Sequence, residues 1–268
     1  MNAPNKGEVQ APFVLQSRDG DVVTLTMNRG DRLNPLSTGM LAALQVALDQ
    51  IAGDITARVV ILAGAGKHFS AGHDLREMRA HADDKAWQSA LFEQCSRMML
   101  RLVELPQPVI ARVQGVAVAA GCQLVSMCDL AVASEAAQFA LPGIKSGIFC
   151  TTPGVGVARN LSRKHTLEML LTGDLIDART AERWGLVNRV APLDRLDDEV
   201  SALARKVASH SPAVVRLGKQ FFYEQIECNV ADAYALASNG MACNMMLEDA
   251  AEGIDAFLDK RTANWRGR

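Results

Sequence analysis

Apolar and polar positions along the first half of the chain predict strands that alternate with helices. Residues 13–27 form two apolar runs around an Asp-Gly turn, which indicates a β-hairpin. Large aliphatic residues recur at helical spacing over 41–51, and the segments 59–62 and 109–113 are short and mostly apolar. This alternation favours an α/β core with a mainly parallel, buried sheet.

Further elements continue the alternation until about Pro192. The pattern predicts a helix over 84–104, a helix of small residues from about Ala120 and a strand from about Leu130. After Pro192 the strand pattern stops, and residues 194–258 have the character of helices throughout. The chain is therefore divided into a disordered lead-in over 1–12, an α/β core over 13–192 and a C-terminal helical section over 193–268.

Length and charge exclude several classes of protein. The chain has 268 residues, of which 49% are hydrophobic, and a formal net charge of −2. The length allows a sizeable core, and the charge balance argues against a nucleic-acid-binding protein, which needs a basic face. No apolar run approaches the roughly 20 residues that span a bilayer, and the start has no apolar signal-peptide core. We therefore expect a cytoplasmic protein that binds neither nucleic acid nor a membrane.

The cysteines and histidines give no sign of a metal centre. The six cysteines form no CxxC pair and lie mostly among apolar or small residues, which favours reduced thiols packed as small hydrophobes. The five histidines are scattered, without an HxxxH pair or a cluster with cysteine. We therefore expect no metal site.

Two loops of small residues follow the apolar segments at 59–62 and 109–113. The first contains Ala71 and Gly72, the second contains Ala119–Gly121, and each lies where a strand gives way to a helix. Small side chains let a ligand approach the backbone, and free N–H groups at a helix start favour negative charge. Each loop alone most often serves only tight packing. Two such loops that face each other form an oxyanion hole, which is often the largest electrostatic contribution in acyl chemistry.

Five segments in register resemble the signature stretches of the crotonase superfamily, that is, of the enoyl-CoA hydratase/isomerase family. They are GAGKHFSAGHDLREM, VQGVAVAAGCQLVSMCDLAVAS, AQFALPGIKSGIFCTTPGVG, EMLLTGDLIDARTAERWGLVNRVAP and EGIDAFLDKRTANW. The resemblance spans roughly residues 13–265 in the expected order. It implies a crotonase-like β-β-α superhelix core with a C-terminal helical section, assembled as a trimer or a dimer of trimers.

The resemblance also implies roles for individual residues. The oxyanion donors would be the N–H groups of Ala71 and Ala120, with His73 and Gln123 completing the catalytic set. Coenzyme A belongs to the substrate, so no separate cofactor is implied. The implied contacts with the acyl-CoA thioester are Arg32, Leu33, Ala71, Gly72, His73, Asp74, Ala120, Gly143, Phe257 and Lys260.

Two positions depart from typical hydratases of the family, which carry a glutamate at each. Gln123 and Gly143 stand there, and neither can take up a proton at ordinary pH. General acid–base catalysis is worth about 10²–10⁴-fold, so ordinary hydration should be crippled. His73 is either an acid or base near neutral pH, as in family members with decarboxylase activity and a similar loop, or a packing residue. Asp129 is expected to cap or anchor buried backbone.

Two functions are therefore open at the level of the sequence. The first is an acyl-CoA enzyme, most naturally an enoyl-CoA hydratase-like lyase, whose chemistry extends to decarboxylation, isomerisation or thioester hydrolysis. The second is a non-catalytic protein that binds CoA thioesters. The intact loops favour the enzyme, and the missing carboxylates favour the binding protein. Lys145, Ser146 and Cys150 in the third segment are expected to be structural.

Overall fold

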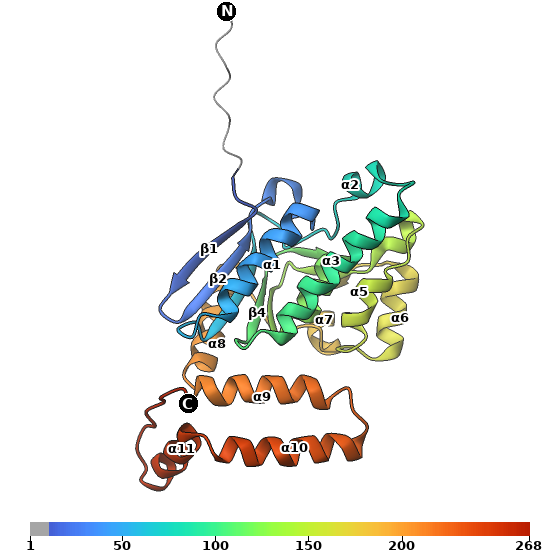
Figure 1. Ribbon diagram of the computed structural model, residues 1–268. Helices are drawn as coiled ribbons and strands as arrows, with labels where there is room; N and C mark the ends of the chain where they lie inside the picture. The colour runs from blue at the N-terminus through green and yellow to red at the C-terminus, as the bar shows by residue number, and fades with distance from the viewer. Residues whose placement is uncertain (1–10) are drawn as a thin grey trace, which may run out of the picture.

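The computed structural model describes residues 11–268. They fold around a six-stranded sheet, which Figure 1 shows with the helices packed around it. Its strands are β1 (Val14–Asp19), β2 (Val22–Met27), β3 (Val59–Gly64), β4 (Val109–Val113), β6 (Leu130–Ser134) and β9 (Arg189–Ala191). Strands β1 and β2 form the predicted antiparallel hairpin. From β2 the sheet continues in parallel through β3, β4, β6 and β9. The predicted mainly parallel sheet is confirmed.

Helices cover both faces of this sheet. They are α1 (Thr38–Ala52), α3 (Lys85–Glu104) and α8 (Leu196–Ala208). Alternate residues of β3 point to opposite faces. Val60 and Leu62 pack in the apolar cluster that includes α1 and α3, whereas Val59 and Ile61 pack in the cluster that includes α8. Because both faces are covered, β3 is a continuous apolar run rather than an alternating one.

A second, three-stranded sheet carries one of the small-residue loops. It consists of β5 (Val116–Val118), β7 (Gln138–Ala140) and β8 (Ile176–Asp177). The sequence pattern predicts only a glycine-containing turn before Ala120, so β5 was missed. A strand of three residues is too short to show a period of two. Directly after β5 comes the predicted small-residue helix, α4 (Ala120–Met127).

Short helices fill the rest of the core. They are η1 (Gly30–Arg32), α2 (Leu75–Ala80), η2 (Pro142–Ser146), α5 (Thr151–Val157), α6 (Arg163–Thr172), α7 (Ala178–Trp184) and η3 (Leu193–Arg195). Two of them bear on the site, because α2 begins directly after the first loop and η2 leads into α5 opposite the second.

The last helices extend away from the core (Figure 1). They are α9 (Pro212–Gln225), α10 (Val230–Met245) and α11 (Glu248–Leu258). The predicted helical character of residues 194–258 is confirmed, with breaks between the helices. Helix α8 belongs to the core by its packing, so the projecting part begins at α9 and not at residue 193.

Asp129 joins this projecting part to the core. Its carboxylate accepts hydrogen bonds from the Val109 N–H (2.6 Å), from Lys219 Nζ (2.7 Å) and from the Tyr223 hydroxyl (2.9 Å). Lys219 also donates to two main-chain carbonyls of the core, at 2.9 and 3.1 Å. The expectation that Asp129 anchors buried backbone is confirmed.

Residues 1–10 of the expected lead-in lie outside the described residues. The carbonyls of Ala11 and Pro12 accept hydrogen bonds from the Arg29 guanidinium, at 2.6 and 2.9 Å. Within residues 11–268 no helix is long and apolar enough to cross a bilayer.

Candidate functional site

A cavity of about 510 Å³ lies between the two small-residue loops and the segment from Pro142 to Pro153. This volume is within the range of about 300–1,000 Å³ that is typical of small-molecule sites. Its wall includes the side chains of Leu75, Ile148 and Phe149, which are 60%, 42% and 45% exposed. Apolar surface gathered in this way, open to solvent, is typical of a ligand site.

The side-chain amides of Asn34 and Gln114 hold the first loop in place by hydrogen bonds. The sequence pattern does not indicate either residue. Asn34 Nδ2 donates to three carbonyls of residues 65–69 at 2.9–3.1 Å, and Asn34 Oδ1 accepts from the Arg29 N–H. Gln114 Nε2 donates to three carbonyls of residues 64–68 at 2.7–3.1 Å. The Asn-Pro dipeptide at 34 signals a turn, but no local pattern shows that these amides reach segments more than 30 residues away.

The second loop is held next to the first by β5. Main-chain hydrogen bonds of 3.0–3.2 Å join residues 69–70 to β5, and the second loop starts at the end of that strand. Ala119 forms the turn with φ 50° and ψ −123°. Such angles suit glycine and strain an alanine. The positive φ falls on Ala119, so Ala120 keeps ordinary helical geometry and its alanine side chain causes no strain.

Gly72 brings the two loops into contact. Its φ is +86°, and a Cβ atom at this position would lie 3.0 Å from the Ala120 nitrogen and 2.9 Å from the Ala119 Cβ. A side chain at residue 72 would therefore fill the space in front of the second loop. Ala120 is the first residue of α4, so its N–H has no acceptor within the helix.

The predicted oxyanion donor at Ala71 is wrong. The Ala71 N–H donates to the Leu33 carbonyl at 2.9 Å, because the first loop runs beside the segment that follows η1. Two residues further on, the His73 N–H has no acceptor among residues 11–268. Both His73 and Ala120 line the cavity. Of the loop residues that line the cavity, Ala71 and Ala119 donate their N–H groups to main-chain carbonyls, whereas the N–H groups of His73 and Ala120 have no acceptor among residues 11–268.

The His73 ring is packed against protein on two sides. Its Nδ1 lies 3.2 Å from the Leu36 carbonyl oxygen, and its ring meets Phe92 edge-on with centroids 5.5 Å apart. The Nε2 atom is buried and has no hydrogen-bond partner in the described part of the chain. Burial lowers the His73 pKa, and the hydrogen bond with Leu36 and the carboxylate of Glu77 oppose this shift only partly. The ring is therefore neutral at physiological pH.

Asp74 acts as a helix cap. Its carboxylate accepts hydrogen bonds from the N–H groups of Arg76 (2.9 Å) and Glu77 (3.4 Å) at the start of α2. It makes no hydrogen bond with the His73 ring, so orientation of that ring by Asp74 is excluded. The cap fixes the point where the first loop turns into α2, in agreement with a role in orienting the loop.

Gln123 and Gly143 occupy different surroundings. Gln123 is 4% exposed and its Oε1 has no partner among residues 11–268, but it does not line the cavity. Gly143 lines the cavity. A Cβ atom there would lie 2.4 Å from the Ile148 carbonyl oxygen and 2.8 Å from Cys150 Sγ. The turn therefore has no room for a side chain at residue 143, because the Ile148 carbonyl and the Cys150 thiol occupy the space that it would need.

Cys150 and its neighbours in the third segment offer no nucleophile. Cys150 Sγ accepts a hydrogen bond from the Gly143 N–H at 3.3 Å, and burial raises the pKa of the thiol. Lys145 is paired with Asp174 at 2.6 Å. Ser146 lines the cavity without a side-chain hydrogen bond in the described residues. The contacts of Cys150 and Lys145 agree with the structural roles expected for these two residues, whereas the role expected for Ser146 stays a prediction.

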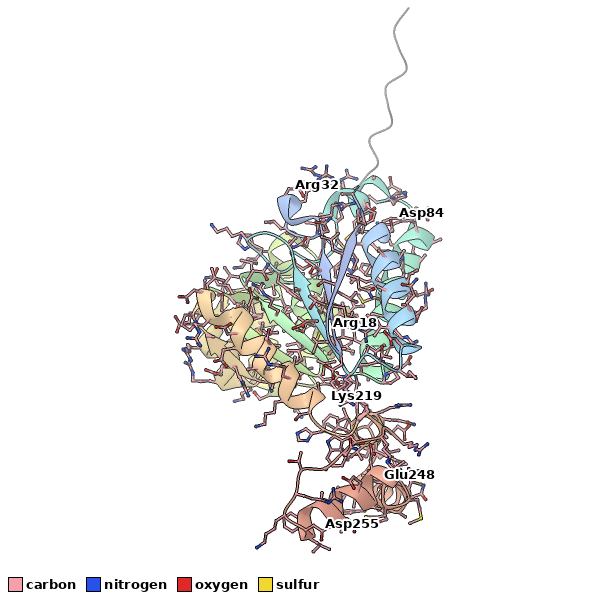
Figure 2. The ribbon with its side chains drawn as sticks, turned by 90° about the vertical axis from the view of Figure 1, so that its left-hand side faces the viewer. Arg18, Arg32, Asp84, Lys219, Glu248 and Asp255 are labelled. Carbon is pink, nitrogen blue, oxygen red and sulfur yellow. The ribbon has the colours of Figure 1, made fainter. Side chains whose placement is uncertain are left out.

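Four of the residues implied to contact CoA lie in two separate regions of the chain. Arg32 and Leu33 are exposed near η1, and Phe257 and Lys260 are exposed in and just after α11. In Figure 2, Arg32 lies at one end of the molecule and Asp255 of α11 lies at the other, with Lys219 between them. None of these four implied contact residues lines the cavity.

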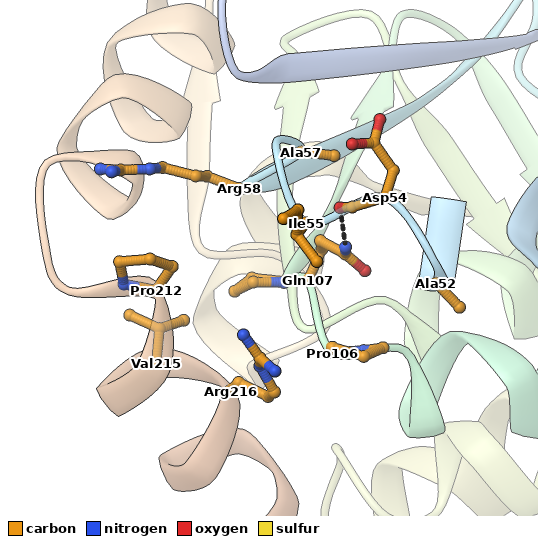
Figure 3. Close-up of a pocket in the computed structure, with 11 residues that line it drawn as sticks. Ala52, Asp54, Ile55, Ala57, Arg58, Pro106, Gln107, Pro212, Val215 and Arg216 are labelled. Atoms are coloured by element: carbon orange, nitrogen blue, oxygen red, sulfur yellow. Dashed lines mark hydrogen bonds between the residues drawn. The ribbon is translucent and has the colours of Figure 1, made fainter. Parts of the chain in front are cut away.

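A second hollow lies where α9 meets the core, and it is not a candidate for the site. Figure 3 shows its lining, which includes Ile55, Arg58, Pro212 and Arg216. Its volume is about 50 Å³, enough for one or two water molecules. It contains none of the residues that the sequence singles out.

Comparison with known proteins decides the family. The sequence profile of the enoyl-CoA hydratase/isomerase family matches residues 17–268. The chain belongs to the enoyl-CoA hydratase/isomerase family. Its α/β core with C-terminal helices is the crotonase fold of that family, as the resemblance implied.

Members of this family with high similarity come from bacteria and animals. A crystal structure of an enoyl-CoA hydratase from Mycobacterium smegmatis is 51% identical, with a TM-score of 0.93 over 95% of this chain and 99% of that one. The crystal structure of human enoyl-CoA hydratase domain-containing protein 3 is 41% identical, with a TM-score of 0.91 over 94% of this chain and 100% of that one. The rat protein of the same name, described as mitochondrial, is 40% identical over 97% of this chain and 86% of its own length.

Proposed function

We propose that this chain binds an acyl-CoA thioester and stabilises the enolate-like charge on its carbonyl oxygen with two N–H donors, those of His73 and Ala120. The observation that carries the proposal is that His73 and Ala120 line one cavity and that neither N–H group has an acceptor among residues 11–268. Hydrogen-bond donors fixed in a partly dry site cost no reorganisation when charge develops. Gly72 keeps the space between them open.

We place the protein in acyl-CoA metabolism as an enoyl-CoA hydratase-like lyase with little ordinary hydratase activity. Typical hydratases use two carboxylates, and this proposal takes Gln123 and Gly143 as the residues at those positions. Neither transfers a proton, and the Gly143 turn has no room for a side chain. The oxyanion site alone stabilises charge without completing the addition of water.

Three alternatives share the same oxyanion site. Decarboxylation and thioester hydrolysis both develop charge on the thioester oxygen, and a non-catalytic protein would use the same donors for binding only. Decarboxylation gains support from His73, since relatives with that activity resemble the chain in this loop. Thioester hydrolysis through Cys150 gains none, because the thiol stays protonated.

The remaining contacts with CoA are assigned by resemblance. Arg32 and Leu33 would approach the nucleotide, residues 71–74 would line the CoA chain, and Phe257 and Lys260 would help enclose the CoA from the C-terminal end of the chain. Because α11 lies at the far end of the molecule, a second copy of the chain would have to supply the last two residues. This arrangement supports the expected homotrimer or dimer of trimers. A cytoplasmic location stays a prediction, since the rat relative is described as mitochondrial.

The test compares a thioester with its thioether. Hexanoyl-CoA and S-hexyl-CoA differ only in the carbonyl, so their dissociation constants, measured by calorimetry, isolate the contribution of the oxygen. We expect the thioester to bind about 30-fold more tightly, since each of the two hydrogen bonds contributes about 1 kcal/mol. Equal affinities would contradict the oxyanion site. Turnover is then assayed with enoyl-, malonyl- and saturated acyl-CoA, and binding without turnover of any of them favours the non-catalytic alternative.

A further inference from the structure

The His73 ring exists as one defined tautomer. Nδ1 lies 3.2 Å from the Leu36 carbonyl oxygen, and a carbonyl oxygen only accepts, so Nδ1 carries the proton. In the neutral ring Nε2 is then a lone-pair acceptor. That lone pair has no donor among residues 11–268 and no access to solvent, and Phe92 packs edge-on against the ring.

Leu36 holds residues 72–73 through main chain and side chain together. The Leu36 N–H donates to the Gly72 carbonyl at 2.8 Å, and Leu36 forms a parallel bridge with His73. The ring Nδ1–H bond adds a side-chain link to the same residue. Leu36 is completely buried, so this carbonyl has no water to replace the ring if the ring is removed.

We propose that His73 is a positioning residue: its Nδ1–H bond to Leu36 fixes the peptide plane of residue 73 and so aims that residue's own N–H at the thioester oxygen. This proposal rests on the proposed oxyanion site and adds to it the reason for a histidine in the first loop. The ring does no proton transfer, and the substrate touches the backbone of His73 rather than its imidazole.

The burial of Nε2 separates this role from acid–base catalysis. A general acid or base has to come within about 2.6–3.2 Å of the proton that it moves. The Nε2 atom is covered by protein, so it reaches the cavity only if the ring turns. A turn of the ring breaks the bond between Nδ1 and Leu36.

Two amide substitutions separate the two ring nitrogens. In His73→Asn the side-chain N–H₂ takes the place of Nδ1 and keeps the donor to Leu36. In His73→Gln the N–H₂ takes the place of Nε2 and leaves Leu36 without a donor. His73→Ala removes both. Each variant is checked by circular dichroism and thermal melting, and its preference for hexanoyl-CoA over S-hexyl-CoA is measured as for the unmodified protein.

We expect His73→Asn to keep the thioester preference within about twofold, and His73→Gln and His73→Ala to lose about fivefold, the equivalent of one of the two hydrogen bonds. The carbonyl stretch of bound hexanoyl-CoA should follow the same order in isotope-edited infrared spectra. Its red shift should be smaller in His73→Gln and His73→Ala than in His73→Asn. The preference of the unmodified protein for the thioester should be constant from pH 6.5 to 8, where the ring is neutral.

Two outcomes overturn the positioning role of the ring. Retained preference in His73→Gln with loss in His73→Asn would assign the role to Nε2. Full preference in all three variants would leave the ring as packing alone. Equal affinity of the unmodified protein for thioester and thioether would instead refute the oxyanion site, so the two failures are distinguishable.

One measurement needs no variant. ¹⁵N NMR of the histidine-labelled protein reports which ring nitrogen carries the proton. We expect the Nδ1–H tautomer in the free protein and after addition of hexanoyl-CoA. A protonated Nε2, or a change of tautomer on binding, contradicts the positioning role.

Discussion

Lys219 Nζ and Asp129 Oδ2 lie 2.7 Å apart where α9 meets the core, and their side chains are only 7% and 15% exposed. Removal of one partner from a buried ion pair leaves an uncompensated charge, at a cost of about 3–5 kcal/mol. We therefore expect Lys219→Met to lower the free energy of unfolding by about this amount, as measured by urea denaturation. The matched control is Arg159→Met, which breaks an exposed pair with Glu227 and should cost about 1 kcal/mol or less. Equal losses would contradict the anchor.

Gly143→Ala should destabilise the protein, because the new Cβ would overlap the Ile148 carbonyl and Cys150 Sγ. Overpacking of this kind costs about 1–3 kcal/mol. Gly218→Ala in α9 is the control, because no atom lies within 4 Å of its added Cβ. A helix gains about 0.5–1 kcal/mol from this change. Opposite shifts in melting temperature are expected, and a stabilised Gly143→Ala would show that the turn is open.

Ala119→Gly should stabilise the fold. The φ of 50° and ψ of −123° at this residue strain an alanine by about 1–3 kcal/mol, and glycine's extra backbone entropy returns about 0.5–1 kcal/mol of that. Ala120→Gly, one residue further on in ordinary helical geometry, should destabilise by about 0.5–1 kcal/mol. Thermal melting of the two variants checks this contrast in sign.

The pH dependence of stability should contain a contribution from His73. Burial holds the pKa of His73 in the folded protein below the ordinary 6.5. Below pH 6.5 the His73 ring is therefore protonated in the unfolded chain while it is still neutral in the folded protein. This contribution is fully present above pH 6.5 and declines as the pH falls toward the folded pKa, by at most about 1.4 kcal/mol per pH unit. The His73→Asn variant should lack this slope in urea titrations between pH 4.5 and 7.5. Parallel curves would place the His73 pKa at its ordinary value.

Hydration of crotonyl-CoA should be slower by about 10²–10⁴-fold than in a family member with both carboxylates. Gln123→Glu restores one ionisable group of similar shape, yet we expect little gain, since residue 143 has no space for the second. The rate of loss of the enoyl absorbance measures both proteins. Robust hydration by the unmodified chain would show that another group transfers the proton.

Long or strongly patterned elements could be predicted from the sequence, because their signal is local. The hairpin at residues 13–27, the strand β3 and the helix α3 each follow from period and length alone. Strand β5 could not, since it has three residues and is defined by its pairing with β7. Asp129 was anticipated as an anchor, but its partner Lys219 lies 90 residues away.

The sequence predicts where the candidate site lies, but it does not show which main-chain N–H groups are free there. Small residues after two strands indicate loops that admit a ligand, and both loops line the cavity. Which main-chain N–H is free to bind a ligand depends on a tertiary contact, because the Ala71 N–H donates a hydrogen bond to the Leu33 carbonyl. In the same way, nothing local shows that Cys150 fills the space beside Gly143.

The distance in sequence between Asp129 and Lys219 has a consequence for biosynthesis. Every residue that lines the cavity precedes α6, so a ribosome has made the whole wall of the cavity well before it makes α9. At roughly 5–20 residues per second, the 90 residues that separate Asp129 from Lys219 take on the order of 5–20 s to translate. During that interval the nascent chain carries an acidic side chain in its core whose counter-ion does not yet exist. Packing of the C-terminal helices against the core is therefore a late step in the synthesis and folding of the protein.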